Sequence, residues 1–134
     1  MTEARVEEVH ANRTDARTYL EQAETFQADA DADVSSESRS VLLHNAVVSA
    51  ADAILQAAGL RVSGGDGAHQ LRIETALAQL GHETDELLDR LEASRSRRNE
   101  ASYHAMLVPD ASIDEAREAT AELIGLAEDF IGSE

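Results

Sequence analysis

The fold of this chain is decided by residues 35–59, which read SSESRSVLLHNAVVSAADAILQAAG. Ser35 and Ser36 are good N-terminal caps for a helix, and Gly59 is a natural place for that helix to end, because glycine adopts the left-handed conformation without strain. Between these ends, apolar residues cover nearly the whole circumference of the helix. A helix with this pattern is touched from several sides. We therefore expect a central helix around which the rest of the chain packs.

Four further segments have the spacing of apolar residues that is typical of helices. They cover residues 16–30, residues 71–80, a stretch from residue 83 or 84 to about 105, and residues 112–132, where the sequence SIDE forms a capping box. Residues 1–13 are mostly polar, and they either fray or extend the first of these helices. The expected fold is all-α, a compact bundle of about five helices in a single domain spanning residues 1–134.

The composition limits both the core and the partners. A chain of 134 residues with only 3% aromatic residues can bury a substantial core, but that core must be aliphatic. The absence of cysteine excludes disulfides and thiolate metal sites. Because the formal net charge is −16, any contact with RNA or DNA must rest on a local basic patch. No apolar run approaches the roughly 20 residues of a membrane span, and the N-terminus lacks the apolar region of a signal peptide, so we expect a cytoplasmic protein without membrane contact.

A local basic patch is present in residues 94–104, which read SRSRRNEASYH and are called the arginine segment below. Its candidate site residues are Arg95, Arg97, Arg98, Asn99, Tyr103 and His104. Arginine forks match phosphate oxygens, and histidine exchanges protons near neutral pH. Arginines late in a helix also stabilise its negative end, which is the structural alternative. Arg98 lies on the helical line that Leu87 and Leu91 occupy earlier, and a charged side chain on a core-facing line requires a partner or a cleft.

With the central helix and the arginine segment in view, residues 14–131 resemble the HEPN superfamily of small helical-bundle domains. The motif of that family is an arginine followed by four to six residues and a histidine. Arg98 and His104 fit it with five residues between them, and Arg97 and His104 fit it with six. The resemblance implies a metal-independent endoribonuclease that needs no cofactor and acts as a homodimer on RNA. It also implies a toxin or defence role, with an antitoxin or a nucleotidyltransferase as a possible partner.

The resemblance also implies roles for the residues of the motif. His104 would transfer protons, Arg98 with the help of Arg97 and Arg95 would bind the phosphate, and Asn99 would orient a neighbour. In the commonest form of the motif the histidine lies four residues after the asparagine, where this chain has Tyr103.

On an ideal helix, a shift of one residue turns a side chain by about 100° and aligns His104 with Arg97. Two outcomes therefore stay open: a local kink or a different arginine restores the site at His104, or Tyr103 marks a branch that keeps the fold and the RNA-facing cleft but not cleavage.

Two other readings of the sequence remain. One is a catalytically inactive helical module that binds a protein or a nucleic acid through the same arginines. The other is a bundle-type metal hydrolase with ligands drawn from two sets, which are His44, Glu100 and His104, or His82, Asp85 and Glu86. By themselves, His44 is predicted to be a core or interface histidine, and His10, His69 and His82 are predicted to be solvated.

Overall fold

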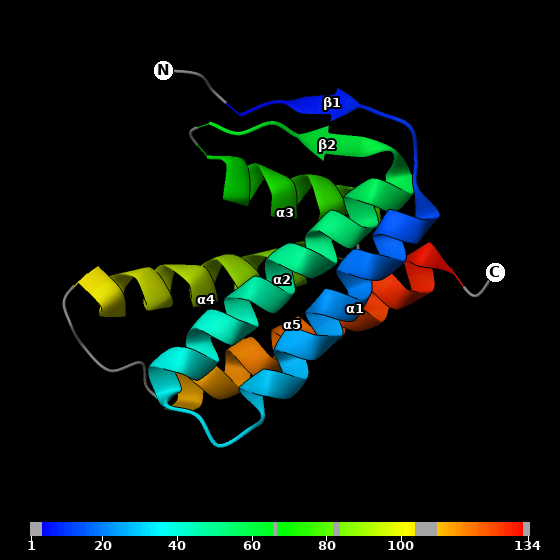
Figure 1. Ribbon diagram of the computed structural model, residues 1–134. Helices are drawn as coiled ribbons and strands as arrows, with labels where there is room; N and C mark the ends of the chain where they lie inside the picture. The colour runs from blue at the N-terminus through cyan, green and yellow to red at the C-terminus, as the bar shows by residue number, and fades with distance from the viewer. Residues whose placement is uncertain (1–3, 66, 82–83, 104–109, 133–134) are drawn as a thin grey trace.

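The computed structural model describes residues 4–65, 67–81, 84–103 and 110–132 (Figure 1). In this part of the chain, five helices pack together with a small hairpin of two strands. The helices are α1 (Arg13–Ala30), α2 (Ser36–Ala58), α3 (Ala68–Ala78), α4 (Asp85–Tyr103) and α5 (Asp110–Ile131), and the strands are β1 (Val6–Glu8) and β2 (Leu60–Val62). The predicted helical bundle is confirmed, whereas the prediction of a purely helical fold is corrected by the hairpin.

Both ends of α2 have the caps that the sequence predicts. The Ser35 hydroxyl accepts a hydrogen bond from the backbone N–H of Ser38 at 3.1 Å. At the other end Gly59 adopts the left-handed conformation, with φ of 75°. A Cβ atom on Gly59 would lie 2.8 Å from the carbonyl oxygen of Val9, so only glycine allows the N-terminal segment to pass this close.

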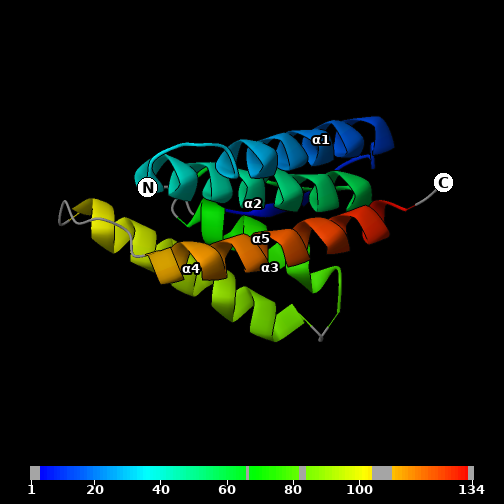
Figure 2. The same cartoon turned by 90° about the horizontal axis from the view of Figure 1, so that it is seen from below.

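The central position of α2 is also confirmed, because it packs against α1, α3, α5 and β2. Figure 2 shows α1 and α2 on one side of α5, and α4 crossing α5 so that its N-terminal half lies on the other side. The buried residues of α2 are mostly small or aliphatic, and they are Leu43, Ala46, Val47, Ser49, Ala50, Ala51, Ala53, Ile54 and Leu55. Among the described residues, α2 is the one helix long and apolar enough to cross a membrane, a criterion that core helices of soluble proteins also meet, and 50% of that apolar stretch is buried inside the bundle.

The N-terminal residues differ from the expectation that they fray or extend the first helix. Val6–Glu8 forms β1, which pairs antiparallel with β2 so that Val6 faces Val62. The helix α1 then begins at Arg13, where the side chain of Asn12 accepts a hydrogen bond from the backbone N–H of Asp15. The strand was missed because its partner lies more than fifty residues further along the chain, and local periodicity carries no signal of such a pairing.

The start of α5 also differs from the prediction. The capping box placed the first turn at Ser112, but α5 begins at Asp110, so Ser112 lies inside the helix.

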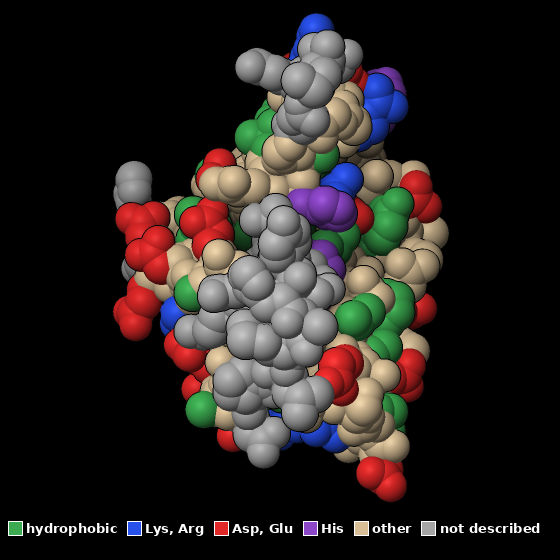
Figure 3. Space-filling view, turned by 90° about the vertical axis from the view of Figure 1, so that its left-hand side faces the viewer, with side chains coloured by type: hydrophobic (Ala, Val, Ile, Leu, Met, Phe, Trp, Pro, Cys, Tyr) green, Lys and Arg blue, Asp and Glu red, His purple; other side chains and the backbone are tan. Residues whose placement is uncertain are grey.

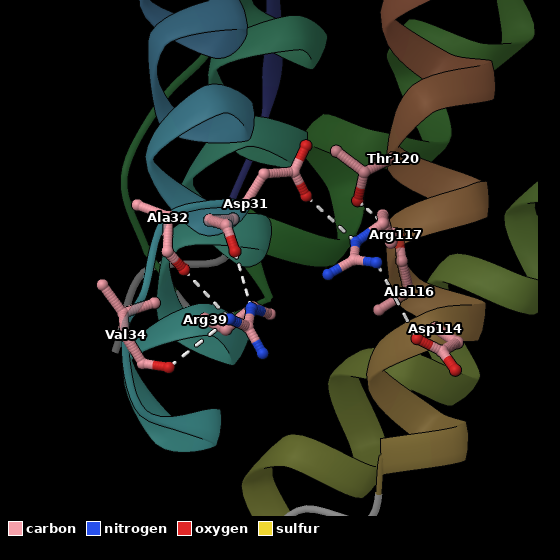
Figure 4. A network of polar contacts seen from close by, with 9 residues as sticks. Asp31, Ala32, Val34, Arg39, Asp114, Ala116, Arg117 and Thr120 are labelled. Atoms are coloured by element: carbon pink, nitrogen blue, oxygen red, sulfur yellow. Dashed lines mark hydrogen bonds and ion pairs between the residues drawn. The ribbon is translucent and has the colours of Figure 1, made fainter.

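Arginine side chains hold the corner at which α1 turns into α2 (Figure 4). Arg39 donates hydrogen bonds to the carbonyl oxygens of Ala30, Ala32 and Val34, at 2.6, 3.0 and 3.4 Å. Arg117 of α5 forms an ion pair with Asp31, with 3.1 Å between Nε and Oδ1. This group of Asp31, Arg39 and Arg117, called the corner cluster below, satisfies carbonyl groups at the end of α1 and connects α1 and α2 to α5.

Candidate functional site

The predicted site lies at the C-terminal end of α4. The backbone is helical through Tyr103, so Arg95, Arg97, Arg98, Asn99 and Tyr103 all belong to the last turns of this helix. The side chains of Arg95 and of residues 97–103 lie outside the described part of the structure, as does the whole of His104. The arrangement of guanidinium, amide and imidazole groups in the arginine segment therefore remains a prediction.

The arginine segment lies in the part of α4 that follows its buried leucines. Leu87 and Leu91 are buried and Ser94 is half-buried. The backbone of Arg98 continues this line at a step of four residues, because α4 runs without interruption from Asp85 to Tyr103. Figure 1 and Figure 2 show this half of α4 reaching outward past the ends of the neighbouring helices. The segment is thus presented at the margin of the bundle.

A small cavity of about 40 Å³ lies at the base of the arginine segment, between α2, α3, α4 and α5. Its wall is largely aliphatic, with polar groups from Ser40, His44, Ser94 and Thr120. The hydroxyl of Thr120 donates to the carbonyl oxygen of Ala116 at 2.6 Å. The buried Oγ of Ser94, by contrast, has no hydrogen-bond partner among the residues that the structure describes. The volume is sufficient for a water molecule, which is the usual partner of a buried hydroxyl in a polar cavity.

Four polar side chains meet between α2 and α3, beside this cavity, and form what is called the seam cluster below: His44, Asp52, His69 and Arg72. The rings of His44 and His69 lie edge to face, with 5.9 Å between centroids and 62° between planes. Nη1 of Arg72 lies 3.3 Å from Nδ1 of His69, and Nε of Arg72 lies 2.9 Å from Oδ1 of Asp52. A continuous chain of contacts therefore runs from the carboxylate of Asp52 to the wall of the cavity.

The contact with Arg72 orients the ring of His69, because Nη1 of Arg72 lies 3.3 Å from its Nδ1. His69 is exposed, so the structure presents an oriented imidazole ring at the surface.

Asp52 orients Arg72, although partial burial disfavours the charged form of the Asp52 carboxyl. Burial raises the pKa of the Asp52 carboxyl, and the attraction of Arg72 and then of His69 only partly opposes this effect. Its side chain remains 28% exposed to solvent. The ion pair therefore neutralises Arg72 and serves to orient it.

Sequence reasoning did not find the seam cluster. His69 was predicted to be solvated; it is exposed, but two contacts hold its ring. His44 was predicted to be a core or interface histidine, and it is half-buried at the wall of the cavity. The only local signal is that His69 and Arg72 are three residues apart in a helix, and so lie on one face.

The metal-site alternative has no support in the described part of the structure. No group of three or more histidine or acidic residues is suitably placed there to hold a metal ion. His82, His104 and the side chain of Glu100 lie outside the described residues, so the two ligand sets proposed from the sequence remain untested.

Comparison with known proteins gave no match: no family model fits the chain, and no curated protein or solved structure is significantly similar to it.

Proposed function

We propose that this chain is a cytoplasmic, HEPN-type protein that binds RNA and cleaves it without a metal ion, as a homodimer. The observation that carries the proposal is the unbroken course of α4 from Asp85 to Tyr103, which brings the concentrated arginines of the chain to the margin of the bundle. Figure 3 shows one face of the molecule, on which histidine and arginine side chains gather near the middle, with carboxylates to either side. An anionic strand is thus favoured at one place on an otherwise acidic protein.

The residue types suit cleavage of RNA without a metal ion. Such cleavage needs a base near the ribose 2′-hydroxyl and positive charge on the phosphate as it gains negative charge. His104 is the proposed base, and Arg98 and Arg97 are the proposed phosphate ligands. Arg95 and Tyr103 contact the strand on either side, and Asn99 orients a neighbouring group.

A homodimer has support in the exposed apolar surface of α2. Val41 is 48% exposed, and it lies with Val34 and Leu42 around a shallow hollow at the start of that helix. We expect Val41→Glu to shift the protein toward the monomer, as measured by size-exclusion chromatography with light scattering. Val9→Glu introduces the same charge at another exposed valine and should leave the oligomeric state unchanged.

One observation favours the second candidate function, an RNA-binding module that does not cleave. Because α4 is helical through Tyr103, Asn99 and Tyr103 lie one turn apart on the same face. Tyrosine is a poor base, with a reference pKa of about 10. If Tyr103 occupies the position opposite the phosphate, the helix keeps its affinity for RNA but lacks the catalytic base.

The test is degradation of a labelled single-stranded RNA by the purified protein in EDTA. Under the first proposal the RNA is cleaved, and His104→Ala and Arg98→Ala each lower the cleavage rate by at least about a hundredfold. The control variant, Arg5→Ala, removes an exposed arginine outside the arginine segment and has no effect. Intact RNA together with binding that Arg98→Ala weakens would support the non-cleaving module. A protein that neither binds nor cleaves RNA would refute both.

A further inference from the structure

The exposed ring of His69 adds a flat side chain to the proposed RNA-binding surface. Aromatic residues make up only 3% of the chain: Tyr103 belongs to the arginine segment, and Tyr19, Phe26 and Phe130 belong to α1 and α5. Single-stranded RNA is held by two kinds of contact, namely positive charge on the backbone and flat side chains on which bases stack. Arginines supply the first kind on α4, and the seam cluster offers the second next to it.

We propose that the imidazole of His69, held by Arg72 and His44, is a stacking surface for one base of a single-stranded RNA whose phosphates lie on the arginine segment. This inference rests on the proposed RNA binding and holds whether or not the RNA is cleaved. It assigns a binding role to α3, a helix outside the predicted motif.

The charge of the seam cluster favours a base over a phosphate. Arg72 is paired with Asp52, with 2.9 Å between Nε and Oδ1, so a carboxylate already lies against its charge. A phosphate would meet this carboxylate at such a site, whereas every nucleobase has a flat face that can stack on the imidazole ring.

The contacts around His69 also suit it for stacking. The edge-to-face geometry with His44 and the hydrogen bond from Arg72 restrict the rotation of the ring. A ring that is already oriented loses less conformational entropy when a base binds. His69 is nevertheless exposed to solvent.

The position of the cluster connects it to α4. His44 belongs to the seam cluster and also lines the cavity that contains Ser94, the first residue of the arginine segment. Gln70, next to His69 in the sequence, lies with its Nε2 3.5 Å from Oε1 of Glu92 on α4. The stacking surface and the start of the arginine segment are thus neighbours, as expected for contacts to adjacent nucleotides of one strand.

The experiment measures the affinity for a short, fluorescein-labelled oligoadenylate by fluorescence anisotropy at low salt. We expect His69→Ala to weaken binding roughly tenfold, the usual effect of removing one stacking partner. His69→Phe keeps a flat ring and should bind within about twofold of wild type. His10→Ala, at another exposed histidine, is the matched control and should bind as wild type does.

A second measurement isolates the base. An oligonucleotide with one abasic position should bind wild type more weakly than the intact one when that position is the stacked base. The His69→Ala variant should bind both oligonucleotides equally. Circular dichroism and the melting temperature show whether each variant is folded.

The other outcomes overturn the inference. If His69→Ala binds as tightly as His10→Ala, His69 does not contact the strand, and RNA binding itself stands. If His69→Phe loses as much affinity as His69→Ala, the ring acts through hydrogen bonding and stacking is wrong. If wild-type protein does not bind the oligonucleotide at all, the proposed function fails together with the inference.

Discussion

The corner cluster and the seam cluster are both polar groups that include residues of α2, yet Arg39 of the first and Arg72 of the second differ in their partners. In the corner cluster, Arg39 donates to three backbone carbonyl oxygens where one helix ends and the next begins. In the seam cluster, Arg72 contacts two side chains, and one of them is the exposed ring of His69. Arg39 therefore contributes to folding, whereas Arg72 orients the side chains on which the proposed base stacking rests.

The largest expected effect comes from removing Arg39 from the corner cluster. Arg39→Ala removes the side-chain donor to the carbonyl of Ala30 and one of two donors to that of Ala32, which keeps the backbone N–H of Val34. We expect the free energy of unfolding to fall by about 2 kcal/mol, since hydrogen bonds from charged donors are the stronger ones. Urea unfolding monitored by circular dichroism measures the change. RNA binding by the folded variant should be unaffected.

The control for that variant is Arg61→Ala. Arg61 forms an ion pair with Glu7, and its side chain is 62% exposed, so its loss should change stability by less than about 1 kcal/mol. Equal destabilisation by the two variants would show that the carbonyl contacts of Arg39 contribute nothing particular to the corner.

A smaller effect is expected in the seam cluster, and it concerns binding more than stability. Asp52→Asn removes the carboxylate that neutralises Arg72, so we expect oligonucleotide affinity at low salt to rise several-fold. Asp129→Asn makes the same change in net charge at an exposed position of α5. If both variants gain affinity equally, the effect comes from overall charge and the local pair has no role.

Asp52→Asn should also change how the stability of the protein depends on pH. Burial raises the pKa of Asp52 in the folded protein, so this carboxyl favours the folded state at acidic pH, and the contribution is lost as pH rises through the folded-state pKa. At neutral pH, Asp52→Asn should therefore be slightly more stable than wild type. The difference should shrink as the pH is lowered toward the unfolded-state pKa of about 4.

The smallest expected effect tests a third arrangement, in which like charges meet between α1 and α5. The pKa of Glu24 is raised first by a hydrogen bond with Glu128, then by burial and by repulsion from Glu128 and Glu21. Its contribution to stability is thus present at acidic pH and is lost as pH rises through the raised pKa.

Glu24→Gln keeps a donor for Glu128 and removes one charge, so a small increase in melting temperature is expected at neutral pH and none at acidic pH. Glu8→Gln, on an exposed strand position, serves as the control. An increase of equal size at both pH values would contradict the explanation from charge.

The confirmed predictions concern features that are encoded locally. Ser35 and Gly59 bound α2 because a cap acts within one turn of its own helix. The buried Leu87 and Leu91 followed from their spacing for the same reason. The prediction of α5 missed its start by two residues, because a serine with a capping pattern lay just inside a helix that begins at Asp110.

By itself, the sequence determined where the helices lie and that α2 is central, because hydrophobic spacing and end caps depend on neighbours only a few residues away. It also pointed to the arginine segment, whose concentration of charge is visible without a fold. The tertiary structure alone decided the pairing of β1 with β2 and the meeting of His44 and Asp52 with His69 and Arg72. These contacts join residues distant in sequence, and they depend on how α2 and α3 pack together.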